Sequence, residues 1–272
     1  MVRKGRFIQK TSAFTLLAVP ALIGAVLAAQ RGPTPEAVPT TRVLVRVTAN
    51  DGKILGSNVQ GARITVRDAS TDEILAEGLQ EGSTGDTRLI MGARERGARV
   101  FDTEGAAGFL AELKLDRPTR VLVTGEGPLA MPHAMQTTSR SLLVVPGKDI
   151  LGDGVILELL GFTVDMESPA AGVRVLAGEQ FEVRGTVTML CGCPTEPGGL
   201  WDASDYEIVA RAVRGGSVVA EWPMEFSGAE STYETQVQVA EAGPVEIQMI
   251  AMDPGKVNFG MATRSLTVSR SR

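Results

Sequence analysis

The chain has 272 residues, a formal charge of −5 at pH 7, two cysteines and one histidine. A chain of this length can bury one large or two ordinary hydrophobic cores, so folding needs no framework of disulfides. The acidic balance argues against nucleic acid and anionic lipid as partners, because both require clustered Lys and Arg.

The first 29 residues have the pattern of a signal peptide. Four basic residues lie within residues 1–10, and residues 11–29 carry no charge and end in small residues that suit cleavage. The alternative is an uncleaved membrane anchor, since about 19 uncharged residues nearly span a bilayer. Without residues 1–29 the chain carries 23 Lys and Arg against 32 Asp and Glu, a formal charge of −9. We therefore expect a periplasmic or secreted protein.

Residues 30–40 are rich in Pro and Thr and predict an extended spacer. A first β-sandwich domain is then predicted over residues 41–147. Its expected strands alternate apolar and polar residues or carry β-branched runs, and they cover residues 41–48, 61–69, 109–115, 120–125 and 141–147. Residues 82–108 are rich in glycine and predict a long inserted loop with a helical turn over 87–96; such loops often carry binding function.

The polar segment 146–154 predicts a domain boundary, followed by a second β-sandwich over residues 155–270. Eight short β segments follow at the regular spacing of two packed antiparallel sheets. Gly215 and Gly216 predict a tight hairpin, because paired glycines supply the positive φ angles of primed turns. Pro223 predicts an edge strand. The expected fold class is all-β, with two tandem antiparallel sandwiches after the signal peptide.

Both blocks resemble known families of exported proteins. VRVTANDGKILGSNVQGARITVRDASTDEILAEG resembles the transthyretin-like or carboxypeptidase-regulatory-like sandwich repeats, although the long insertion replaces the usual Asp-Gly before an aromatic strand. SPAAGVRVLAGEQFEVRGTV and VEIQMIAMDPGKVNFGMATRSLTV resemble the first and last strands of a bacterial immunoglobulin-like domain. The second resemblance implies a fold and no particular chemistry, because such domains serve as adhesion, spacer, glycan-contacting and partner-binding units.

The two cysteines lie in MLCGCP, at the end of an expected strand. On that strand Phe181, Val183, Val187 and Met189 share the core face with Cys191, while Cys193 lies beside a loop. Cys191 and Cys193 could form a disulfide if Gly192 folds the chain inward, or remain inert thiols. They could also bind Cu(I) together with the Met189 thioether, or carry out redox exchange, although no Lys or His adjoins them in sequence.

Two further segments are candidate sites. Met131, His133 and Met135 alternate in MPHAM, as in copper-binding segments, and would share one side of an extended loop. Residues Trp201, Asp202, Asp205 and Tyr206 are a candidate binding surface, in which an aromatic ring lies beside carboxylates. The simpler interpretation of this second group is a core tryptophan next to a solvated loop.

No serine-hydrolase elbow, phosphate loop or zinc-protease motif occurs in the sequence. The sequence therefore predicts an exported, non-enzymatic, two-domain binding protein without a cofactor, whose partner is another exported or cell-envelope protein or a glycan. The alternative is a periplasmic Cu(I)-binding or thiol-redox accessory protein that uses the MLCGC cluster.

Overall fold

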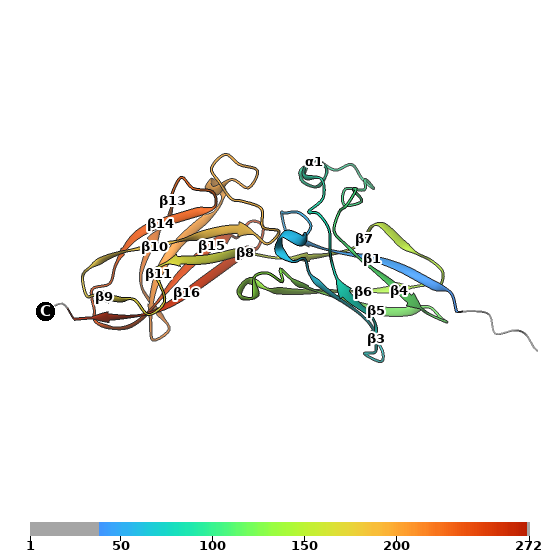
Figure 1. Ribbon diagram of the computed structural model, residues 1–272, viewed down its shortest axis with the longest axis horizontal. Helices are drawn as coiled ribbons and strands as arrows, with labels where there is room; N and C mark the ends of the chain where they lie inside the picture. Colours follow the sequence, from blue (N-terminus) through green and yellow to red (C-terminus); the bar gives the residue numbers. More distant parts are fainter. Residues whose placement is uncertain (1–37, 271–272) are drawn as a thin grey trace, which may run out of the picture. The chain divides into compact units, whose positions relative to one another are not determined.

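The computed structural model describes residues 38–270 (Figure 1), so the predicted signal peptide and residues 30–37 of the spacer lie outside the described residues. Strands dominate, and they form four sheets that build two sandwiches. The all-β prediction is confirmed. Among residues 38–270, no helix is long and apolar enough to cross a membrane.

The first sandwich packs a three-stranded sheet, in the order β4-β1-β7, against a four-stranded sheet, in the order β3-β2-β5-β6. The strands are β1 (Thr40–Ala49), β2 (Arg63–Asp68), β3 (Ile74–Leu79), β4 (Phe109–Lys114), β5 (Thr119–Gly127), β6 (Gln136–Val144) and β7 (Ile150–Leu159). Alternation on β1 buries Val43, Val45 and Val47 completely. The structure therefore confirms strands at the five predicted positions, and β3 is an additional strand.

The predicted boundary at residues 146–154 is wrong. β7 runs parallel to β1, with Val45 opposite Val155 and Val47 opposite Leu157, so it belongs to the first sandwich. The chain leaves that sandwich after Leu159, at Gly161, where φ is +131°. The mostly apolar run of 155–166 resembles one strand in sequence, but its two halves lie in different sheets, one in β7 and the other in β8.

The second sandwich packs the sheet β13-β14-β10-β8 against the sheet β12-β11-β15-β16-β9. The strands are β8 (Phe162–Ser168), β9 (Arg174–Leu176), β10 (Gln180–Met189), β11 (Glu207–Arg214), β12 (Ser217–Pro223), β13 (Glu225–Phe226), β14 (Thr232–Gln238), β15 (Gly243–Asp253) and β16 (Asn258–Ser269). β9 pairs parallel to β16, and the other pairs are antiparallel.

This strand order is that of an immunoglobulin-like domain. β8, β10, β14 and β13 take the places of strands A, B, E and D, while β11, β15 and β16 take those of C, F and G. The hairpin prediction is confirmed, because Arg214 pairs with Ser217 and both glycines between them have positive φ. Pro223 lies on β12, an edge strand as predicted, and the chain then changes sheet into β13.

The inserted segment 82–108 is an ordered loop with one short helix, α1 (Thr87–Met91), within the predicted range. Asp86 begins this helix by accepting hydrogen bonds from the backbone N–H groups of Arg88 and Leu89. Apolar side chains of the insertion, including Ile90, Val100 and Phe101, bury themselves against Ile54 in a separate small core. Hydrophobic burial therefore holds the loop on the first sandwich.

Candidate functional site at the junction of the two sandwiches

The CGC segment forms a tight turn at the end of β10. The N–H of Gly192 donates to the carbonyl of Met189 (2.8 Å), and the N–H of Met189 donates to the carbonyl of Cys193 (3.0 Å). Gly192 has a φ of +73°, a conformation that glycine adopts readily. The turn brings the Cα atoms of Cys191 and Cys193 to 5.4 Å, and the structure joins the two cysteines in a disulfide.

The disulfide lies at the edge of the core. Val183, Val187, Met189 and Cys191 have no exposed surface and Cys193 is 5% exposed. Phe181 is partly buried and packs against the same core, so the core-face prediction for this strand is confirmed. Both cysteines come from the end of one strand. The bond therefore does not cross-link the two sheets of the second sandwich, as the disulfide of antibody domains does.

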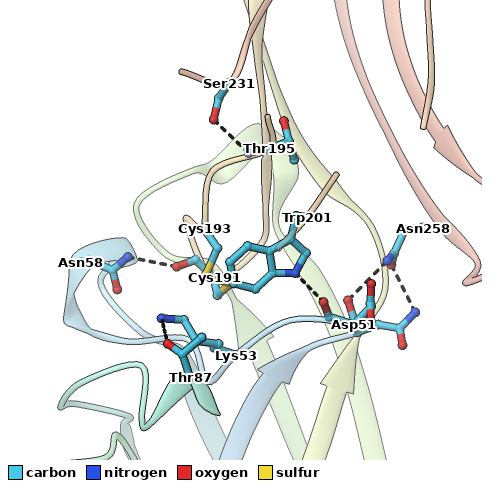
Figure 2. Close-up of a disulfide and its surroundings, with 11 residues drawn as sticks. Asp51, Lys53, Asn58, Thr87, Cys191, Cys193, Thr195, Trp201, Ser231 and Asn258 are labelled. Atoms are coloured by element: carbon cyan, nitrogen blue, oxygen red, sulfur yellow. Dashed lines mark hydrogen bonds between the residues drawn. A yellow bond between two sulfur atoms is a disulfide. The ribbon is translucent and has the colours of Figure 1, made fainter. Parts of the chain in front are cut away.

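The turn contacts the first sandwich directly (Figure 2). The Asn58 side-chain amide donates to the carbonyl oxygen of Cys191 (2.9 Å). A Cβ atom on Gly192 would lie only 2.9 Å from Asn58 Nδ2 and from Val59 Cγ1. The backbone at Gly192 therefore packs directly against the short helical turn Ser57–Val59, with no room for a side chain between them. The disulfide turn is thus part of the junction between the two sandwiches.

Trp201 supplies the second contact across the junction. Its indole Nε1–H donates to the carbonyl oxygen of Asp51 (2.7 Å), as Figure 2 shows, and the side chain is 6% exposed. Asp51 also forms an ion pair with Lys256 of the second sandwich (2.7 Å). The Lys256 ammonium donates a hydrogen bond to the Asp51 carboxylate, and this bond raises the pKa of Lys256. Apolar burial, a neutral hydrogen bond and an ion pair therefore join the two sandwiches here.

A pocket of about 350 Å³ opens beside the disulfide. Its lining comes from three segments far apart in sequence: Lys53 and Asn58, residues 82–84 of the insertion, and Cys191 to Pro194 with Trp201. Figure 2 shows the Lys53 side chain on the side of the disulfide that faces the first sandwich, where its ammonium donates to Thr87 Oγ1 (3.1 Å). Sequence reasoning did not single out Lys53 as a neighbour of the cysteines, because it lies about 140 positions away from them along the chain.

The insertion that borders this pocket is held at its far end by one carboxylate. Asp153, on β7, accepts hydrogen bonds from the backbone N–H groups of Val100 (3.1 Å), Phe101 (2.9 Å) and Asp102 (2.9 Å). Arg94 adds a cation–π contact to Phe101, with its guanidinium carbon 5.1 Å from the ring centre. The pocket wall is therefore built on an anchored loop.

The MPHAM segment differs from the extended loop that the sequence predicted. Pro132–Ala134 form a helical turn, so the three side chains point to different surroundings. Met131 Sδ accepts from Thr163 Oγ1 (3.5 Å), His133 Nε2 lies 2.9 Å from Asp165 Oδ1, and Met135 is largely exposed. Within residues 38–270, no three His, Cys, Asp or Glu side chains lie close enough to hold a metal ion.

The predicted binding surface around Trp201 also needs correction. Trp201 is buried in the junction, and Tyr206 packs edge-on against Phe162 with ring centres 5.0 Å apart. Burial raises the pKa of Tyr206. The Asp202 carboxylate accepts a hydrogen bond from the backbone N–H of Ser204 (2.9 Å), and this bond lowers the pKa of Asp202. Asp205 is exposed. The structure therefore favours the simpler interpretation of a core tryptophan beside a solvated loop.

No family model matches the chain, and no curated protein matches it. Among solved structures, an engineered protein is similar over 46% of this chain, with 16% identity and a TM-score of 0.30, and the chain spans only 24% of its length. Fibronectin(III)-like modules of Clostridium thermocellum CbhA are similar over 85% of this chain and 94% of theirs, with 11% identity and a TM-score of 0.28. The titin domains z1z2, in complex with telethonin, are similar over 87% and 100%, with 11% identity and a TM-score of 0.24. At such TM-scores the likenesses carry no argument, and the immunoglobulin-like assignment rests on strand order alone.

Proposed function

We propose that the chain is an exported, non-enzymatic interaction protein of the cell envelope, and that its partner binds an apolar patch on the second sandwich. The patch consists of Ile250 and Met252 on β15 and Phe259 and Met261 on β16. The observation that carries the proposal is the exposure of Phe259 and Met261, beside the half-buried Ile250 and Met252, on the outer face of a sheet, where polar residues are the rule.

The register of the two strands makes the patch continuous. Met252 lies opposite Phe259, and Ile250 lies opposite Met261, so the four side chains form two adjacent cross-strand pairs. The intervening residues of β15, Met249 and Ala251, are fully buried, which directs Ile250 and Met252 to the outer face. Phe259 is 47% exposed and Met261 is 52% exposed.

The chemistry of the patch favours a protein partner over a glycan. Phe and Met are enriched where proteins contact one another, and the flexible Met side chain adapts to different partner shapes. Glycan recognition would require polar groups beside an exposed aromatic ring, whereas the neighbours of Phe259 in the patch are apolar. Acidic residues elsewhere on the chain, with its formal charge of −9 over residues 30–272, keep such a protein soluble.

Site-specific photo-crosslinking in the intact source cells tests this function. A photo-reactive residue at Met261 should capture one discrete envelope protein, while the same residue at Thr267, exposed on the same strand and face, should capture none. Equal capture at both positions, or none at Met261, would contradict the proposal. A crosslinked product of twice the chain mass would mean that the patch binds a second copy of this chain and not another protein. Recovery of the chain in the cytoplasmic fraction would contradict export.

Binding of Cu(I) stays a prediction. The ligands expected at Met189, Cys191 and Cys193 are present as a buried thioether and a disulfide, so thiolate ligation requires that the bond be reduced first. Metal analysis of the reduced protein after incubation with Cu(I) measures it. Retention of one equivalent that is lost in a Cys191→Ala, Cys193→Ala variant would support copper binding, and no retention would remove it.

A further inference from the structure

The disulfide forms part of the wall of a pocket that reaches solvent. Cys191, Gly192 and Cys193 all line the pocket of about 350 Å³, together with Lys53 and Asn58. Cys193 is the cysteine that keeps some exposure, whereas Cys191 keeps none. A nucleophile in the pocket therefore meets Cys193 first.

From this arrangement we propose that the Cys191–Cys193 disulfide is a reactive site for thiol–disulfide exchange with a dithiol partner. In this exchange the positive charge of Lys53 stabilises the negative charge on the sulfur that leaves. One thiolate of the dithiol attacks Cys193 Sγ, the bond between Cys193 and Cys191 breaks, and Cys191 leaves as a thiolate. The second thiolate of the dithiol then attacks the dithiol sulfur of the mixed disulfide, the bond from that sulfur to Cys193 Sγ breaks, and Cys193 leaves as a thiolate. The partner is oxidised to a disulfide, and the chain is left with two reduced cysteines.

The position of the Cys191 sulfur supports the role proposed for Lys53. A Cβ atom on Gly52 would lie 3.4 Å from Cys191 Sγ, so this sulfur packs against the backbone immediately before Lys53. Lys53 is the single charged side chain among the residues that line the pocket in the described part of the chain. A nearby ammonium favours a thiolate over a thiol, and a sulfur of lower thiol pKa leaves faster. Lys53 acts on the sulfur by charge and takes no proton in this step.

Exchange at this site would act on the junction. The bond closes the turn whose Cys191 carbonyl accepts from Asn58 and whose Gly192 packs on Val59. Opening the bond removes the covalent constraint on that turn. We therefore expect the reduced chain to keep both sandwiches and to lose part of the coupling between them, which gives the exchange a structural readout.

The test uses the full exported chain and dithiothreitol as the dithiol. At neutral pH two cysteines should become open to alkylation while the far-UV circular dichroism of the two sandwiches stays native. Lys53→Met should slow this reduction about threefold, because the leaving thiolate loses its positive neighbour. Lys148→Met, at an exposed lysine in the turn after β6, should leave the rate unchanged, and Lys53→Arg should restore it.

A second measurement separates a charge effect from a loss of packing. In the reduced protein, the pH at which alkylation reaches half its maximal rate should be higher in Lys53→Met than in the parent chain and Lys53→Arg. Cysteines that react only at the rate of global unfolding, or a Lys53→Met variant with the rate and pH profile of the parent chain, would overturn the proposal. The apolar patch is not used in this experiment, so its outcome leaves the crosslinking test of the proposed function unaffected.

Discussion

Gly192 occupies both a backbone conformation and a space that suit glycine alone. Its φ is +73°, and a Cβ atom would lie 2.9 Å from two atoms of the first sandwich. Gly198 has a similar φ of +69°, but no atom lies within 4 Å of the position of its Cβ. The two glycines therefore separate the cost of backbone strain from the cost of a steric clash.

We expect Gly192→Ala to lower the free energy of unfolding by about 2–4 kcal/mol, since strain and a clash add. Gly198→Ala should cost about 1 kcal/mol, which is the backbone cost alone. Urea denaturation of both variants measures the difference. Equal losses in the two variants would mean that the junction relaxes freely around residue 192.

Ionisation of Tyr206 should lower the stability of the folded protein in alkali. Burial raises its pKa, so the folded chain keeps the phenol neutral at a pH where the unfolded chain ionises it. The stabilisation is complete below the unfolded pKa of about 10 and is lost as the pH rises towards the folded value. Tyr206→Phe should therefore unfold at the same urea concentration as the parent near pH 7 and at a higher one above pH 10.

Tyr233 provides the matched control for Tyr206. Burial raises its pKa too, but its hydroxyl also pairs with Thr195 Oγ1 (2.8 Å) in the core. Tyr233→Phe should therefore lower the urea midpoint already at neutral pH, because Thr195 loses a partner. If Tyr206→Phe and the parent chain lost stability in parallel above pH 10, ionisation of Tyr206 would play no part in alkaline unfolding.

At the scale of an element, the insertion depends on Asp153. Its carboxylate accepts three backbone N–H groups, from Val100, Phe101 and Asp102. An asparagine has one oxygen acceptor and turns an NH₂ group toward donors, so Asp153→Asn leaves at least one amide unpaired. We expect hydrogen exchange at residues 100–102 to become about tenfold faster, measured by mass spectrometry.

The core strands provide the internal reference for this experiment. Exchange in β1 and β5 should be unchanged in Asp153→Asn, because their hydrogen bonds do not involve the insertion. Unchanged exchange at residues 100–102 would show that the small core around Ile90 and Phe101 holds the insertion without the carboxylate.

At the scale of the whole molecule, Trp201 couples the two sandwiches. Their buried apolar residues form one continuous cluster that includes Trp201 and the disulfide. We expect Trp201→Ala to cost about 3–5 kcal/mol and to split thermal unfolding, measured by calorimetry, into two transitions. Trp222→Ala should destabilise the second sandwich alone, because Trp222 lies on the edge strand β12. A single transition in Trp201→Ala would show that the remaining contacts suffice for coupling.

The sequence predicted the elements of this fold far better than their assembly. Alternation in β1 and β10 and the glycine pair at 215–216 are local signals, and the structure confirms them. The boundary at 146–154 was wrong, because the mostly apolar run from Val155 to Met166 resembles one strand and its division at Gly161 depends on which sheet each half joins. Trp201 was correctly considered as a core residue, but its acceptor, Asp51, lies 150 positions earlier.

By itself the sequence determined the all-β class, most strands and their buried faces. It also determined that the chain must turn at Gly192 if the two cysteines are bonded. These features are local, because side-chain alternation and the backbone freedom of glycine act over a few residues. The tertiary structure alone decided that Lys53, the insertion and the disulfide share one pocket, and that β7 completes the first sandwich. These juxtapositions depend on contacts between residues such as Asn58 and Cys191, 133 positions apart, which arise from the packing of whole sandwiches and leave no local pattern.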